Sequence, residues 1–232
     1  MKFCLFSINN PSLQAVVDRL STFGEVVIYN DSLFNSDLDN VDIVVSIGGD
    51  GTLLRASQIA LKHDLPLVGI NAGHLGYLCA FKINELDNIT LSSFENLKES
   101  HRTLLEYNNE LAVNDVCLLK LDPSQSIEVD VKNVAIWKGD GVIFSTATGS
   151  TSYNQSAGGP ILNSLSKDIV VTPICPHFSN DGYKVFSNEN TFEAEIIGKG
   201  KAVISCDGRV LGPVEGKIII KKSNKTLRLL SK

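Results

Sequence analysis

Ser46-Ile47-Gly48-Gly49-Asp50-Gly51-Thr52 follows an apolar, β-branched run at 41–45 and precedes a segment, 53–61, whose apolar residues recur at helical spacing. The pattern predicts a strand and a helix joined by a tight glycine turn. Glycines let a backbone approach a ligand closely, and the first turn of a helix offers unpaired N–H groups to an anion. The stretch therefore predicts a phosphate site at the end of a strand.

Asp50 is the unusual residue of this turn, because a carboxylate repels a phosphate. It needs a separate task there, such as holding a cation or accepting a proton. The alternative is that Asp50 or Thr52 only caps the helix. The residues of the turn leave both interpretations open.

A second glycine-bearing turn, 72–78, follows another apolar strand pattern. Strands are predicted at 2–8, 25–29 and 66–71 and a helix at 11–23, which together begin an open parallel sheet. Loops beyond the carboxyl ends of parallel strands gather at one crevice, so both glycine turns are expected to face the same ligand. His74 in the second turn is either a catalytic base or a structural residue whose side chain hydrogen-bonds within the turn.

The pattern changes near residue 100. Residues 84–100 are expected to form a polar amphipathic helix, after which short alternating segments predict a mainly antiparallel sheet. The predicted fold is α/β plus mainly-β. Residues 1–100 are assigned to an N-terminal open parallel Rossmann-like α/β domain, and residues 101–232 to a C-terminal mainly antiparallel β domain.

The segment 139–160 is rich in serine, threonine and glycine and has no long aliphatic residue after Phe144, so it cannot be a core strand. Its hydroxyls suit a sugar, Tyr153 offers a ring for stacking, and Asp140 can accept from amide or ribose donors. A flexible surface loop is the alternative. Ser150 or Thr151 is also a candidate cap for a short helix.

Asn114 and Asp115 interrupt an apolar strand pattern. Neighbouring side chains of a strand point to opposite faces, so one of these two must turn inward. An inward amide or carboxylate needs a partner. The pair is therefore a candidate binding element.

Composition narrows the class of protein. The chain has 232 residues, 43% hydrophobic and 20% charged, with a net charge of −5 and no run of Lys and Arg, which argues against nucleic-acid binding. No leader pattern and no apolar segment of roughly 20 residues is present, so a cytoplasmic protein without a membrane partner is expected. The cysteines are expected to be buried thiols in a reducing compartment, namely Cys4, Cys79, Cys117, Cys175 and Cys206.

Taken together, these motifs resemble the NAD kinase family, the enzymes that phosphorylate the adenosine ribose 2′-hydroxyl of NAD. The resemblance covers nearly the whole chain. It rests on 48–52, 71–76, Asn114-Asp115, 140–161, 174–177 and 206–208. The first motif is shared with lipid kinases and resembles one in phosphofructokinases, whereas the second-domain motifs in this order are specific.

The resemblance implies a role for each matching residue. Asp50 would accept the proton of the 2′-hydroxyl, with Gly51 against the nucleotide, and Asn114 and Asp115 would hold the adenosine. The implied nucleotide-binding set is Gly48, Gly49, Asp50, Gly51, Arg55, Asn114, Asp115, Lys138, Asp140, Thr148, Thr151, Ser152, Tyr153, Ser156, Cys175 and Arg209. Asp140 would face the nicotinamide end. Ser152 departs from the usual alanine, and Asp115 from a frequent glutamate.

The resemblance also implies a divalent metal, normally magnesium, with NAD and ATP, possibly polyphosphate, as substrates. A homodimer or homotetramer is implied, with a neighbouring subunit contributing to the site. Phosphoryl transfer needs an anion cradle, a cation and a proton acceptor, and the Gly48–Thr52 turn fits that need. A lipid kinase and a non-catalytic dinucleotide sensor are the alternatives.

Overall fold

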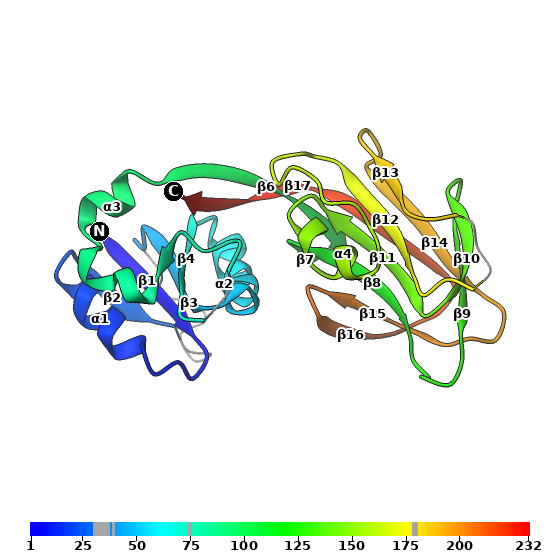
Figure 1. Cartoon of the computed structure of the whole chain (residues 1–232), viewed down its shortest axis with the longest axis horizontal. Coiled ribbons are helices and arrows are strands. Elements are labelled where there is room, and N and C mark those ends of the chain that lie inside the picture. The colour runs from blue at the N-terminus through cyan, green and yellow to red at the C-terminus, as the bar shows by residue number, and fades with distance from the viewer. Residues whose placement is uncertain (30–37, 39, 74–75, 178–180) are drawn as a thin grey trace. The chain divides into compact units, whose positions relative to one another are not determined.

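The chain folds into two compact units, residues 1–101 with 227–232, and residues 102–226 (Figure 1). The structure is a computed structural model and describes residues 1–29, 38, 40–73, 76–177 and 181–232. The predicted loop at 30–40 falls mostly outside these residues, and His74 lies outside them altogether.

The first unit is an open parallel sheet with helices. Its elements are β1 (Lys2–Ser7), α1 (Leu13–Ser21), β2 (Glu25–Ile28), β3 (Ile43–Gly48), α2 (Asp50–His63), β4 (Leu67–Asn71), β5 (Phe81–Lys82), the 3₁₀ helix η1 (Ile83–Asn88) and α3 (Leu91–Glu95). The strands follow the order β4-β3-β1-β2, all parallel, with β5 beside β4. In the part of the chain described, no helix is both long enough and apolar enough to cross a membrane.

The second unit is mainly antiparallel. Its elements are β7 (Glu110–Ala112), β8 (Asp115–Lys120), β9 (Ile127–Val131), β10 (Ala135–Gly139), β11 (Gly141–Thr146), the 3₁₀ helix η2 (Gly149–Thr151), α4 (Tyr153–Ser156), β12 (Ile169–Ile174), β13 (Lys184–Phe186), β14 (Thr191–Ile197), β15 (Ala202–Cys206) and β16 (Arg209–Val214). One sheet has the order β13-β12-β11-β8-β15-β16, and β10, β9 and β14 belong to the other. Side chains from both sheets, including Trp137 and Phe144, form one buried core. This architecture confirms the predicted fold class.

Two long strands, β6 (Lys98–Tyr107) and β17 (Lys217–Ser231), belong partly to each unit. The sequence placed residues 227–232 in the second domain, whereas they lie with the first unit. Leu229 pairs with Leu67 of β4. Arg228 Nε and Nη2 donate to the two oxygens of the Glu99 carboxylate, at 2.8 and 3.0 Å. Backbone pairing and this bidentate contact explain why the chain end returns to the first sheet.

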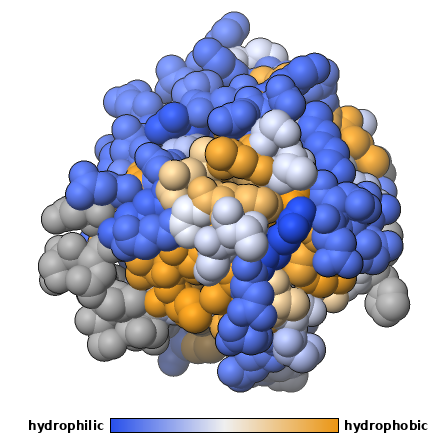
Figure 2. All heavy atoms as spheres, turned by 90° about the vertical axis from the view of Figure 1, so that its left-hand side faces the viewer, coloured by the Kyte–Doolittle hydropathy of each residue, from blue (hydrophilic) through white to orange (hydrophobic). Residues whose placement is uncertain are grey.

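Lys232, together with residues of β5, η1 and α3, lines a pocket of about 560 Å³ on the first unit. The Lys232 ammonium lies 2.9 Å from the Glu85 carboxylate and 5.2 Å from the centroid of the Phe81 ring. Figure 2 views the side of this unit that carries α1 and α3, where hydrophilic side chains surround smaller hydrophobic areas. The ion pair and the ring contact therefore help to hold the chain end on this unit.

The expected helix at 84–100 is wrong. The chain forms η1 and α3 instead, with extended backbone at Ile89 and Thr90 between them, and β6 begins at Lys98. The Thr90 N–H donates to Ser93 Oγ at 3.0 Å, which starts a new helix at this point. Threonine competes with helical hydrogen bonding through its side chain and is favoured at caps, so the apolar spacing alone was misleading.

Candidate active site

The two glycine turns of the first unit meet at one edge of its sheet. Gly48, at the end of β3, is in register with Asn71, at the end of β4. The Ala72 N–H donates to the Gly48 carbonyl at 3.2 Å. Adjacent parallel strands thus bring together the turns that the sequence predicted to face one ligand.

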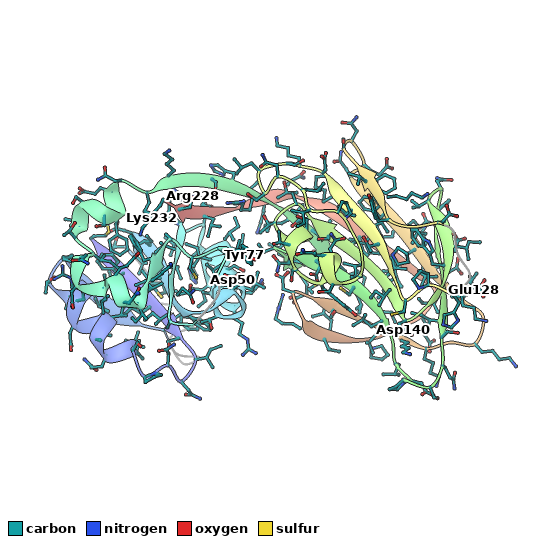
Figure 3. The ribbon with its side chains drawn as sticks, in the orientation of Figure 1. Asp50, Tyr77, Glu128, Asp140, Arg228 and Lys232 are labelled. Atoms are coloured by element: carbon teal, nitrogen blue, oxygen red, sulfur yellow. The ribbon has the colours of Figure 1, made fainter. Side chains whose placement is uncertain are left out.

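Asp50 directs its carboxylate toward the second turn. Its Oδ2 accepts the Tyr77 N–H at 2.9 Å, and its Oδ1 accepts the Leu78 N–H at 3.2 Å. Figure 3 labels Asp50 and Tyr77 in the first unit. The N-cap of α2 is Gly49, and no side chain caps this helix among the residues described. The capping role considered for Asp50 and Thr52 is therefore wrong. The Thr52 N–H donates to the Gly49 carbonyl at 3.0 Å, so the N–H groups that α2 offers to an anion are those before Thr52.

The glycines of the first turn differ in what they are needed for. A Cβ at Gly48 would collide with Thr52, and its φ is +154°, so the fold itself requires glycine there. A Cβ at Gly49 or Gly51 would meet no described atom within 4 Å, and neither residue has a positive φ. Packing of the described chain does not require these two glycines, whereas close approach of a ligand would.

The backbone from Val113 to Asp115 has all its polar groups paired. The three N–H groups donate to the Asp207 carboxylate at 2.8, 2.7 and 3.2 Å in chain order. The carbonyls of Val113 and Asn114 accept from the hydroxyl and the N–H of Thr146, at 2.6 and 2.9 Å. The Asp115 carbonyl accepts the Asp207 N–H at 3.0 Å. This frame holds the Asn114 and Asp115 side chains in fixed places.

Two buried oxygens beside this frame have no hydrogen-bond partner among the described residues, Asn114 Oδ1 and Thr148 Oγ1. Both residues are buried, with 7% and 6% of their area exposed. Gly149 packs so closely on Asn114 that a Cβ there would collide with the Asn114 backbone. A buried polar atom without a partner costs about 1–3 kcal/mol, so the arrangement suits a ligand that brings its own donors and acceptors.

The expectation that the hydroxyl-rich segment 139–160 cannot be a core strand is wrong for its first part, because Gly141–Thr146 form β11, a buried strand between β12 and β8. The remainder is held by hydrogen bonds within the segment and is not a flexible loop. Ser150 Oγ donates to the Ala147 carbonyl at 2.7 Å and accepts the Leu162 N–H at 3.0 Å. Asn154 Nδ2 donates to the carbonyls of Ser150 and Pro160, at 3.1 and 2.9 Å. The cap expected from Ser150 or Thr151 is wrong, because α4 has no side-chain cap and the Ser150 hydroxyl is used inside the segment.

The predicted ligand-facing residues of this segment lie at its surface. Ser152, Tyr153 and Ser156 are exposed and Thr151 is half-buried. The pKa of the Tyr153 phenol is raised. Partial burial of the ring is the largest cause, and nearby thiols and carboxylates, which include Asp140 and Asp115, are smaller ones.

Asp140 and Asp115 lie near opposite ends of β11. Gly141 pairs with Leu119 and Ser145 with Asp115, so five strand residues, about 17 Å, separate the two positions. The Asp140 carboxylate forms an ion pair with Lys120 at 2.7 Å, a partner that no sequence pattern indicated. The second unit therefore offers one acidic group at each end of this strand.

Two domain models match the chain, the ATP-NAD kinase N-terminal domain over residues 16–96 and the ATP-NAD kinase C-terminal domain over residues 100–231. The chain belongs to the NAD kinase family. This confirms the resemblance that the sequence motifs indicated, and the family is one of phosphotransferases.

Individual NAD kinases support the assignment. The NAD kinase of Sulfurimonas denitrificans is 35% identical over 214 residues, covering 86% of this chain and 75% of that protein. The NAD kinase of Chlorobium limicola is 36% identical over 213 residues, covering 84% and 73%.

Two solved structures share the fold. An NAD kinase from Archaeoglobus fulgidus in complex with ATP has a TM-score of 0.83 and 27% identity, covering 99% of this chain and 93% of that one. Yeast NADH kinase complexed with NADH has a TM-score of 0.83 and 22% identity, covering 100% and 83%. The second likeness concerns the fold alone.

In this NAD kinase family member, the remaining predicted site residues have varied surroundings. Arg55 is exposed on α2 and Lys138 is exposed on β10. Cys175 is exposed just after β12, with a left-handed φ of +46°, and Cys79 is only partly buried, so the expectation that every cysteine is buried is wrong for these two. Arg209 donates to the Glu110 carboxylate at 3.0 Å and to the Leu111 carbonyl at 3.2 Å. Their roles toward a nucleotide stay predictions.

Asp115 lies in a setting that disfavours its charge. Burial, and after it the neighbouring Asp207 carboxylate, raise the pKa of this carboxyl to about 6, although a 3.3 Å hydrogen bond from the Cys117 thiol acts in the opposite direction. Asp115 is 5% exposed. The family resemblance gives this residue a contact with adenosine, and the free protein maintains it at a cost in stability.

Asp115→Asn is expected to raise the free energy of unfolding at pH 8. Because the folded-state pKa is raised from 3.8 to about 6, stability present below pH 4 is lost as the pH rises through about 6. Asparagine removes this loss, which amounts to about 3 kcal/mol at most. Urea unfolding of both proteins at pH 4 and pH 8 measures it. A variant less stable than the parent at pH 8 would show that Asp115 is not destabilising.

Proposed function

We propose that this chain transfers the γ-phosphoryl group of ATP to the 2′-hydroxyl of the adenosine ribose of NAD, giving NADP and ADP. The observation that best supports it in the structure is the pair of unpartnered buried oxygens, Asn114 Oδ1 and Thr148 Oγ1, beside the buried Asp115. These groups suit a ligand with hydroxyls and ring nitrogens. They do not suit the apolar chains of a lipid acceptor.

In this proposal the second unit binds the dinucleotide. Asn114 and Asp115 hold the adenosine, and Thr148, Thr151, Ser152 and Ser156 supply hydrogen bonds, with Tyr153 packing on the ligand. Asp140 accepts from the nicotinamide end. Ser152 adds a hydroxyl where the family usually has alanine, and Asp115 reaches one methylene less far than glutamate.

Asp50 is the proposed proton acceptor. The 2′-hydroxyl gives its proton to the Asp50 carboxylate while its oxygen forms a bond to the γ-phosphorus, and the bond from that phosphorus to the bridging oxygen of ADP breaks. The Tyr77 and Leu78 N–H groups hold the carboxylate in place, and each of its oxygens keeps a further lone pair. Gly49, Gly51 and the start of α2 bind the phosphates.

A divalent metal, expected to be magnesium, is part of the proposal. Among the described residues, no three His, Cys, Asp or Glu side chains are grouped so as to hold a metal ion. Magnesium in kinases is held to a large extent by the phosphates of the substrate and by water, so the phosphates that the glycine turn is proposed to bind would carry the metal. When bound, the metal neutralises charge on the phosphates.

A coupled assay of NADP formation with purified protein tests the proposal. NAD or NADH is combined with ATP or polyphosphate, each with and without magnesium, and diacylglycerol replaces the nucleotide in a parallel reaction. NADP formed from NAD and ATP with magnesium is the expected result. Phosphorylation of the lipid alone would identify a lipid kinase, and tight NAD binding without any turnover would identify a sensor.

Two further properties belong to the same proposal. We place the chain in the cytoplasm as a homodimer or homotetramer, in keeping with the family resemblance, with a neighbouring subunit contributing to the site. Light scattering after size-exclusion chromatography gives the mass in solution, and a monomer that is fully active would contradict the contribution of a second subunit.

A further inference from the structure

We infer that Asp207 is a positioning residue of the nucleotide site: its carboxylate fixes the backbone from Val113 to Asp115, so that Asn114 and Asp115 present their side chains to the nucleoside. The inference rests on the proposed function, because it concerns the residues that would hold the adenosine. Asp207 itself does not have to touch the ligand.

The contacts of the Asp207 carboxylate are all with one short segment. Oδ1 accepts the N–H groups of Asn114 and Asp115, and Oδ2 accepts that of Val113, at distances of 2.7 to 3.2 Å. Hydrogen bonds to a charged acceptor are shorter and stronger than those between neutral groups. Three of them from consecutive residues hold the start of β8 in one conformation.

A simpler explanation is that Asp207 only forms the turn between β15 and β16. Cys206 pairs with Arg209, and the two residues between them have φ values of +48° and +75°, which is the geometry of a two-residue hairpin turn. Asparagine suits such a turn at least as well as aspartate. Replacing Asp207 with asparagine therefore preserves the turn and changes only the charge and one acceptor atom.

The acceptor that Asp207→Asn removes is Oδ2, the oxygen that accepts the Val113 N–H. An asparagine oxygen can still accept from Asn114 and Asp115, but its NH₂ group then faces the Val113 N–H, so two donors meet. The segment must shift to relieve this contact. If the inference is right, this shift weakens the binding of NAD and leaves the binding of ATP unchanged.

The charge of Asp207 also acts on Asp115. The groups that face the Asp115 carboxyl are Asp207 from the turn, the Cys117 thiol on the same strand, the Cys206 thiol from β15 and the Tyr153 phenol from α4. Of these, Asp207 is the neighbouring carboxylate that raises the pKa of Asp115. Removing its charge should lower the pKa of Asp115, so the pKa of Asp115 reports that the two carboxyl groups lie side by side, and the affinity for NAD reports the positioning.

The test compares Asp207→Asn, Asp207→Glu and the control Asp122→Asn. Asp122 is an exposed aspartate whose carboxylate accepts the Ser124 N–H at 2.9 Å, so it loses a similar contact away from the proposed site. For Asp207→Asn we expect the KM and Kd for NAD to rise about tenfold, the KM for ATP to stay within about twofold, and the pH midpoint of NAD binding to fall. Asp207→Glu keeps the charge, so its midpoint should stay while its NAD affinity falls.

An unchanged KM, Kd and pH midpoint for NAD in Asp207→Asn would overturn the inference. If the variants do not fold, the parent protein still decides it through carbon-13 titration of the Asp115 carboxyl and hydrogen exchange of the three amides. The inference would be contradicted if the Asp115 carboxyl titrated near its ordinary pKa. It would also be contradicted if the backbone amides of Val113, Asn114 and Asp115 exchanged rapidly, because the Asp207 carboxylate would then not hold them. These two measurements need no turnover, so they separate failure of this inference from failure of the proposed kinase activity.

Discussion

Asp50→Asn is expected to lower kcat for NADP formation by about 10³-fold while the Kd for NAD changes little. Asparagine has nearly the same shape as aspartate but cannot accept the proton of the 2′-hydroxyl. Steady-state kinetics gives kcat, and calorimetry gives the Kd for NAD.

The structural role of Asp50 has to be separated from its chemical role. Asparagine loses one of the two acceptor oxygens now used by Tyr77 and Leu78, which should cost about 1 kcal/mol of stability. Asp42→Asn is the matched control, because the Asp42 carboxylate also accepts a backbone N–H, that of Lys2 at 2.7 Å, in the same unit. If Asp50→Asn lost activity only in proportion to its loss of folded protein or of NAD binding, Asp50 would be a structural residue.

Gly51→Ala is expected to lower kcat/KM for ATP by about 100-fold without destabilising the protein. The added methyl meets no described atom within 4 Å, and alanine is the better helix former by up to about 1 kcal/mol. The methyl would occupy space that the proposed phosphate contact needs, and a misplacement of about 1 Å can cost about 100-fold in rate. Kinetics and thermal unfolding measure the two effects on the same protein.

Gly182→Ala is a suitable control for this change. A Cβ at Gly182 also meets no described atom within 4 Å, and Gly182 lies in the other unit. This control should alter neither the kinetics nor the melting temperature appreciably. Wild-type kinetics for Gly51→Ala would mean that nothing approaches the turn closely enough to need glycine.

Local patterns were enough to predict the first glycine turn and its flanking elements. Residues 41–45 are β-branched and apolar, and 53–61 repeat at helical spacing, so β3, the turn and α2 follow from neighbouring residues alone. The same reasoning failed at 84–100, where apolar spacing suggested one helix and the cap at Thr90 divided it. Capping depends on single hydrogen bonds, which periodicity does not reveal.

The sequence by itself determined that two polar residues, Asn114 and Asp115, interrupt an apolar pattern and that an inward one needs a partner. The expectation that both lie in a strand is wrong for Asn114, because β8 begins at Asp115 and Asn114 lies in the connection from β7. Only the tertiary structure decided that both are buried, that Asn114 Oδ1 is left unpaired among the described residues, and that the frame around them comes from Asp207, 94 residues beyond Val113. The pairing of Asp140 with Lys120 and the return of residues 227–232 to the first sheet were decided in the same way. The physical reason is that strand order and register bring distant residues into hydrogen-bonding range, and neither is encoded in the spacing of near neighbours.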